Sequence, residues 1–207
     1  MKKITFYVAM AAMVLLSSCS MITGSEIDTE ETVNSLKELV KENVTDKGMR
    51  VIELTIMPQE ALTNKPDLIT LLVADKDNSF HRITLLKGLK DYDVTKDEEV
   101  DTTDALKFKN HKNAESVATL EVDKLPADVI KKQVEDAKTQ IPEGYDFKGV
   151  GSYKITVLSG KPVTTFKIQV TENGNSTKVT GRRIQTTYYE LDCTVDDAGK
   201  TTVKLDD

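Results

Sequence analysis

The apolar residues of this chain recur first at the spacing of a helix and then at every second position, as in strands. This order of a helical pattern followed by strand patterns occurs twice. After Thr29 or Asp28, either of which can cap a helix, apolar residues at helical spacing predict a helix that begins near Glu30. The sequence Asp-Lys-Gly at residues 46–48 is expected to end it. Runs of alternating apolar residues then predict strands at residues 50–57, 67–74, 80–86 and 115–122.

The same order returns in the second half of the chain. Asp123 and Pro126 are typical of a helix start, and apolar residues at helical spacing continue to Ile141. Gly149 and Gly151 lie in the first alternating run that follows, and they predict a bulge or a sharp bend there. Turn-forming residues separate the predicted strands, which lie at residues 146–158, 163–170, 178–195 and 201–205.

This order of elements predicts an α+β fold of two tandem units, residues 29–123 and 124–207, each with one helix packed on a roughly four-stranded antiparallel sheet. The layout resembles the cystatin-like and PepSY-like domains of exported bacterial proteins, and also the tandem plan of the secreted β-lactamase inhibitor proteins. The resemblance lies in the order of elements and not in a sequence motif. It implies a binding or inhibitory role towards another exported protein, and it assigns no functional residue.

The first 18 residues have the organisation of a secretory signal. Two lysines precede an apolar stretch at residues 4–16, which is too short to cross a bilayer because a spanning helix needs about 20 apolar residues. A Leu-Ser-Ser-Cys sequence at residues 16–19 ends this stretch, and it resembles the lipobox of bacterial lipoproteins. The alternative is an ordinary signal peptide followed by an incidental cysteine.

The lipobox resemblance implies that Cys19 carries a diacylglycerol on its sulfur and becomes the first residue of the mature chain. Several acyl chains on one cysteine give a stable anchor, since each buried methylene contributes about 0.8 kcal/mol. Residues 19–28 lack periodicity and are expected to form a tether. In enterobacterial lipoproteins an Asp after the cysteine favours the inner membrane, so Ser20 implies the outer membrane. The expected location is therefore the cell envelope.

Charge and cysteine content narrow the range of partners. The net charge is −6, and loss of the two signal lysines makes the mature chain −8, without a basic stripe that would favour nucleic acid. Cys193 is the only cysteine besides Cys19, so no intrachain disulfide is expected. Its alternating surroundings predict a small core residue, with a reactive thiol as the alternative. The absence of Trp and the few other aromatic residues disfavour a carbohydrate-binding module.

Residues suited to catalysis or metal binding are sparse. His81 and His111 are far apart in the sequence and are expected to be ordinary strand and surface residues. The polar segment 87–114 is expected to be a long surface loop. It contains the densest carboxylate cluster, formed by Asp91, Asp93, Asp97, Glu98, Glu99, Asp101 and Asp104. Because this cluster lacks the glycine and the terminal glutamate of an EF-hand loop, we predict no metal site, and we also predict no catalytic residue and no cofactor.

The sequence therefore favours a non-enzymatic, lipid-anchored envelope protein that binds an exported protein, a peptide or another envelope component. The polar face of the sheet or the segment 87–114 would be its contact surface. Arg182, Tyr188 and Glu190, which strand alternation would place together, are the candidate contact residues. Two alternatives are a structural subunit of a surface assembly, with edge strands that pair between chains, and a hydrolase with a dispersed histidine and carboxylate site.

Overall fold

The computed structural model describes residues 26–77, 79–87, 92–99, 118–174, 176–180 and 183–204. In chain order its helices are α1 (Glu30–Asn43), the short 3-10 helices η1 (Thr45–Lys47) and η4 (Val122–Lys124), and α2 (Val129–Lys138). Its strands are β1 (Arg50–Met57), β2 (Leu68–Ala74), β3 (Phe80–Lys87), β4 (Tyr92–Glu99), β5 (Tyr145–Leu158), β6 (Lys161–Glu172), β7 (Thr177–Thr180), β8 (Arg183–Thr186), β9 (Tyr189–Val195) and β10 (Thr201–Lys204).

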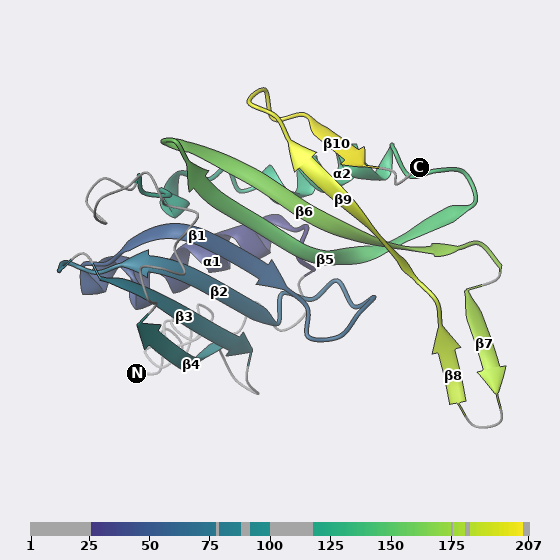
Figure 1. Cartoon of the computed structure of the whole chain (residues 1–207), viewed down its shortest axis with the longest axis horizontal. Helices are drawn as coiled ribbons and strands as arrows, with labels where there is room; N and C mark the ends of the chain where they lie inside the picture. Colours follow the sequence, from purple (N-terminus) through teal and green to yellow (C-terminus); the bar gives the residue numbers. More distant parts are fainter. Residues whose placement is uncertain are drawn as a thin grey trace, which may run out of the picture.

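Eight of these strands form one antiparallel sheet in the order β10-β9-β6-β5-β1-β2-β3-β4 (Figure 1). The protein is therefore a mixed helix and antiparallel sheet fold, as predicted, but the sheet is larger than the predicted four strands. The two halves of the chain join where residues 53–56 of β1 pair with residues 153–156 of β5. This pairing satisfies backbone groups that would otherwise lie at the open edges of two separate sheets. Duplication of the two halves stays a prediction.

Both helices pack against one face of the sheet, and their apolar stripes enter one hydrophobic core. The buried residues of α1 are led by Val33, Leu36 and Val40, and those of α2 by Ile130 and Val134. Helix α1 begins as predicted, because the hydroxyl of Thr29 accepts a hydrogen bond from the main-chain N–H of Thr32 at 3.3 Å. Gly48, with a φ of 74°, follows η1 in the left-handed conformation that glycine favours.

Three sequence-based predictions about elements were wrong. The segment 87–114 contains β4, which pairs with β3 where a surface loop was expected. The strand expected at residues 115–122 is not observed in its described part, since residues 118–121 have no regular structure and Val122 begins η4. The run 178–195 is divided into β7, β8 and β9, because the chain reverses direction between Thr180 and Arg183. Figure 1 shows the resulting β7–β8 hairpin projecting away from the large sheet.

The predicted irregularity around the two glycines of β5 is confirmed. The pairing of β5 with β6 shifts register between Phe147 and Gly149, and again between Val150 and Ser152. A Cβ atom at Gly149 would lie 2.9 Å from the Cβ of Asn64, so the absence of a side chain lets the loop between β1 and β2 approach β5 closely.

Candidate binding surface

The face of the sheet opposite the helices carries a row of threonines in register. Alternation sends the neighbours of this row, such as Leu54, Ile155 and Phe166, into the core. None of the side chains of the row is buried. Cross-strand pairing connects its members from β2 to β10 in the order Thr70, Thr55, Lys154, Thr165, Thr194 and Thr202. We call this set the threonine row, and it gives the outer face a polar strip across six strands.

Charged side chains on the outer face are paired with one another. The ammonium group of Lys154 lies 2.8 Å from a carboxylate oxygen of Glu53. Further along the sheet, Lys167 lies 3.2 Å from Glu190 and 3.8 Å from Asp192. A hydrogen bond from Gln169, and after it the contact with Lys167, holds the pKa of Glu190 below its usual value. The outer face thus carries both signs of charge within an acidic protein.

The three candidate contact residues do not all have a described place on this face. Glu190 lies on it, because Glu190 pairs with Gln169 on the side of β9 opposite the buried Cys193. Tyr188 is 39% exposed, but it precedes β9, so strand alternation does not fix its direction. Arg182 lies outside the described residues. The predicted clustering of the three residues therefore stays a prediction.

Tyr189 is an exposed aromatic residue at the start of β9. It is 44% exposed although it shares its side of β9 with Cys193. Its ring packs edge to face on the ring of Tyr145, with 5.6 Å between the ring centroids. Tyr189 is exposed because it is the first residue of β9, at the end of the sheet where the β7–β8 hairpin leaves it.

Gln169 fastens the loop between β1 and β2 to the outer face. Its side-chain oxygen accepts a hydrogen bond from the main-chain N–H of Leu62 at 2.6 Å, and its side-chain nitrogen donates to Glu190 at 3.2 Å. Gln169 is only 4% exposed, so the loop shields it from solvent. Because 107 residues separate Leu62 from Gln169, no local pattern of residues predicts this contact.

Asn64 connects the start of the described chain to β5. Its main-chain oxygen accepts from the N–H of Ile27 at 2.9 Å, and its side-chain nitrogen donates to Asp28 at 2.9 Å and to Glu26 at 3.3 Å. Its side-chain oxygen accepts from the N–H of Val150 at 2.9 Å. Asn64 is 5% exposed, so these four bonds, which we call the Asn64 network, lie in a largely buried place.

Lys138, at the end of α2, extends the Asn64 network. Its ammonium group lies 3.1 Å from Asp28 and 2.8 Å from Glu135, and 4.4 Å from the centre of the Phe147 ring. Partial burial by itself lowers the pKa of Lys138, but the hydrogen bonds to Glu135 and Asp28 outweigh it and raise the pKa. A largely buried carboxylate, Asp28, is therefore paired with a cation.

His81 forms a pair with a carboxylate, but the pair belongs to a turn. Its Nε2 lies 3.1 Å from Oδ2 of Asp75. The other oxygen of Asp75 accepts hydrogen bonds from the main-chain N–H groups of Asp77 and Ser79, which shape the β2–β3 turn. The bond from Ser79 and the contact with His81 lower the pKa of Asp75. His111, the other histidine, lies outside the described residues.

The carboxylate cluster is divided by β4. Asp93, Asp97, Glu98 and Glu99 are residues of that strand, whereas Asp91, Asp101 and Asp104 lie outside the described residues. Within the ranges that the structure describes, no three His, Cys, Asp or Glu side chains are grouped so that they could hold a metal ion. In the same ranges, none of the helices is long and apolar enough to cross a membrane.

Cys193 lies in the core. Its side chain is 1% exposed, and burial raises the pKa of the thiol to about 12. The thiolate is the nucleophilic form, so this environment disfavours a reactive cysteine. The prediction of a small core residue is confirmed. Cys19 lies outside the described residues.

No protein-family model and no curated protein matches the sequence. Among solved structures, the chain is similar to a crystal structure of a candidate lipoprotein from Clostridium difficile 630, with 16% sequence identity and a TM-score of 0.45. The similarity covers 89% of this chain and 97% of that one. A likeness of this degree carries no argument about function or about the lipid anchor.

Proposed function

We propose that the protein is a lipid-anchored envelope protein that binds an exported protein or peptide and does not catalyse a reaction. The observation that supports this proposal is the outer face of the sheet, where the threonine row crosses six strands beside paired charges. Cys19 holds the lipid in this proposal, and Ser20 directs the protein to the outer membrane, both by resemblance to bacterial lipoproteins.

The dimensions and chemistry of the outer face suit a protein partner. Neighbouring strands lie about 4.8 Å apart, so the five steps of the threonine row extend roughly 24 Å, which matches the width of a standard protein interface. Hydroxyl groups offer donors and acceptors, and the pairs Lys154–Glu53 and Lys167–Glu190 offer charges that fix the orientation of a partner.

The two alternatives have weaker support. A hydrolase would need a histidine and an acid in a concave site, whereas the described pair, His81 and Asp75, closes a turn. Assembly through strand pairing would need open sheet edges, and side chains of Asp136 and Gln140 already bond the outer edge of β10.

Site-specific photo-crosslinking tests the proposed contact surface. A photoreactive phenylalanine derivative would replace Thr55 or Thr165 in the threonine row, and in a control it would replace Thr45, which is exposed in η1. In living cells we expect one discrete protein adduct from positions 55 and 165, and none from position 45. Adducts of equal yield from all three positions, or from none, would contradict binding through the outer face.

The lipid anchor needs a separate measurement. Labelled palmitate is expected to enter the wild-type protein and not a Cys19→Ala variant, and mass spectrometry of the mature chain should place the acyl groups on Cys19. An unmodified Cys19 in the mature chain would contradict the proposed lipid anchor. It would not contradict binding through the outer face, which the crosslinking experiment tests separately.

A further inference from the structure

The described chain begins at a point that is fixed to the sheet. The Asn64 network holds residues 26–28 against β5 through Val150. Seven residue steps separate Cys19 from Glu26, and a fully extended chain spans at most about 3.6 Å per residue. A lipid on Cys19 therefore keeps Glu26 within roughly 25 Å of the membrane surface, whatever path the tether takes.

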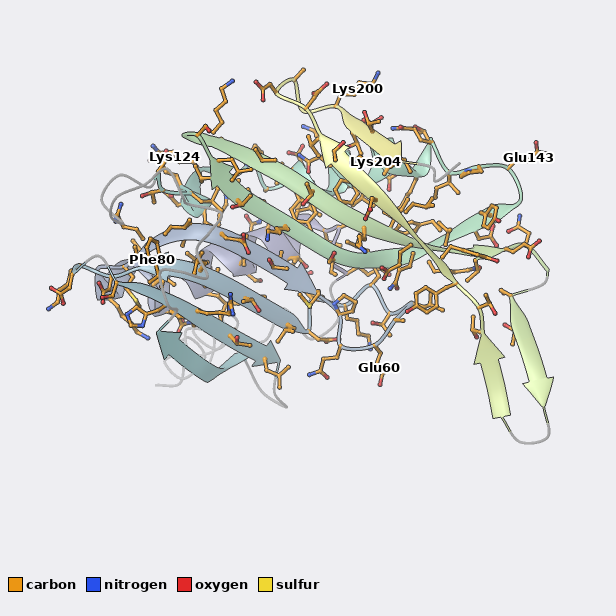
Figure 2. The ribbon with its side chains drawn as sticks, in the orientation of Figure 1. Glu60, Phe80, Lys124, Glu143, Lys200 and Lys204 are labelled. Carbon is orange, nitrogen blue, oxygen red and sulfur yellow. The ribbon has the colours of Figure 1, made fainter. Side chains whose placement is uncertain are left out.

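This fixed point lies at the end of the sheet from which the β7–β8 hairpin projects. Gly149, next to Asn64, pairs with Gln169, and Gln169 lies three residues before Glu172, where β6 ends. At about 3.3 Å per residue, the Asn64 network lies roughly 10 Å from the start of the hairpin segment. In Figure 2, Glu60, in the loop that contains Asn64, and the hairpin lie in the lower part of the view, whereas Lys124 and Lys200 lie in the upper part. A membrane that holds Cys19 is thus close to the hairpin.

The hairpin segment has a charge opposite to that of the rest of the chain. The seventeen residues between Glu172 and Glu190 contain no carboxylate and three basic residues, whereas the whole chain contains 34 acidic residues and has a net charge of −6. Two of the basic residues lie on described strands. Lys178 is a residue of β7 and Arg183 is a residue of β8, and the two strands pair with each other along their length.

Two exposed tyrosines stand where the hairpin joins the sheet. Tyr188 and Tyr189 are 39% and 44% exposed, and among described residues the one other large apolar side chain with comparable exposure is Leu158, at 42%. Tyrosine has an apolar ring and a polar hydroxyl, and it is enriched at the interface between lipid and water. Basic residues close to a membrane surface are attracted by anionic headgroups.

We propose that the β7–β8 hairpin, with Tyr188 and Tyr189 at its base, is a second membrane contact that binds anionic phospholipid headgroups. The proposal rests on the lipid anchor of the previous subsection, because the short tether is what brings the hairpin to the membrane. Each basic residue close to an anionic surface strengthens binding roughly five-fold. A lipid chain and a basic surface together hold a protein more firmly than either does alone, and two separated contacts also fix the orientation of the sheet.

Vesicle co-sedimentation tests the hairpin without the lipid. The probe is the mature chain (residues 19–207) with Cys19→Ser, mixed with vesicles of phosphatidylcholine alone or with an equal amount of phosphatidylglycerol. We expect binding to the anionic vesicles only, and weaker binding as salt increases. Lys178→Gln with Arg183→Gln should weaken this binding roughly 25-fold. The control pair, Lys124→Gln with Lys200→Gln, removes the same charge from the opposite side of the molecule and should change binding less than about two-fold.

Two results with vesicles would overturn the proposal, provided that circular dichroism shows all variants to be folded. One is equal binding to both kinds of vesicle, and the other is an equal loss in the hairpin pair and the control pair. Binding to soluble polyglutamate but not to anionic vesicles would also overturn it, since the hairpin would then recognise an acidic polypeptide. An unmodified Cys19 together with intact vesicle binding would overturn the lipid anchor and leave the headgroup binding of the hairpin in place.

Discussion

The side-chain amide of Gln140, just after α2, donates a hydrogen bond to the main-chain carbonyl of Thr201 on β10, at a distance of 3.0 Å. The oxygen of the same amide accepts from the N–H of Val203 at 3.2 Å, and Asp136 accepts from the N–H of Thr201 at 2.7 Å. In the described sheet β10 is a terminal strand, so these are backbone groups that a further strand would bind. The side chains of Asp136, in α2, and of Gln140 therefore occupy this edge of the sheet.

Removal of these side chains should open that edge. In a double variant, Gln140→Ala with Asp136→Ala, three backbone groups of β10 lose their partners, and we expect self-association that increases with protein concentration. Analytical ultracentrifugation would measure it against the wild type. Lys131→Ala, on an exposed part of the same helix, is the control and should behave as the wild type does. An unchanged sedimentation coefficient in the double variant at high concentration would show that β10 is protected in another way.

The Asn64 network should contribute strongly to stability. Asn64→Ala leaves the buried N–H of Val150 without its acceptor and removes a hydrogen bond from Asp28. Asn64 also has a φ of 51°, which asparagine adopts more readily than alanine does. We expect the free energy of unfolding to fall by about 2–4 kcal/mol, measured by urea denaturation. Asn34→Ala, exposed on α1, should change it by less than about 0.5 kcal/mol, and a similar small effect at Asn64 would contradict the role of the network.

The two glycines of β5 should respond differently to alanine. At Gly149 a new Cβ would lie 2.9 Å from the Cβ of Asn64 and 3.1 Å from its main-chain nitrogen, whereas at Gly151 it would meet the end of the Gln169 side chain at 3.0 Å. A backbone cannot move aside as a side chain can, so Gly149→Ala should cost more, about 2–3 kcal/mol against about 1 kcal/mol.

A double-mutant cycle identifies the cause of the Gly149→Ala effect. In an Asn64→Gly background the opposing Cβ is absent, so the cost of Gly149→Ala should decrease by about 1 kcal/mol or more. Equal costs in both backgrounds would mean that the alanine acts through the main chain of residue 64 or through the backbone of β5, and not through the Cβ of Asn64.

The sequence predicted those features that depend on neighbouring residues. The cap at Thr29, the apolar stripes of both helices and the alternation around Cys193 are all local patterns, and all are observed. β4 was missed because its residues are mostly polar or charged, as edge strands often are, so it lacks the apolar alternation of a half-buried strand. The run 178–195 was taken as one strand because alternation continues from the residues of β7 to those of β8, although Gly181 between them was a local signal for a break.

The contacts around the candidate binding surface could not be predicted from patterns of neighbouring residues. Asn64 and Val150 are 86 residues apart, and Leu62 and Gln169 are 107 apart. Such pairs are decided by how the strands order themselves in the sheet, and the pairing of β1 with β5 has no signature in either strand alone. The threonine row follows from the same pairing, so only single threonines, and not their alignment, could be found in the sequence.

The buried thiol of Cys193 should make stability fall at alkaline pH. Burial raises the pKa of this thiol from 9.0 to about 12, so in the unfolded chain it loses its proton at a pH where the folded protein keeps it. Between pH 9 and 10 the unfolded state then binds fewer protons than the folded state, and the free energy of unfolding should decrease by about 1 kcal/mol. Burial also raises the pKa of Tyr153, but a tyrosine contributes mainly above pH 10. Urea denaturation of Cys19→Ser at several pH values would measure the decrease, and Cys193→Val in the same background should remove it. A decrease of the same size in the valine variant would assign the pH dependence to other groups.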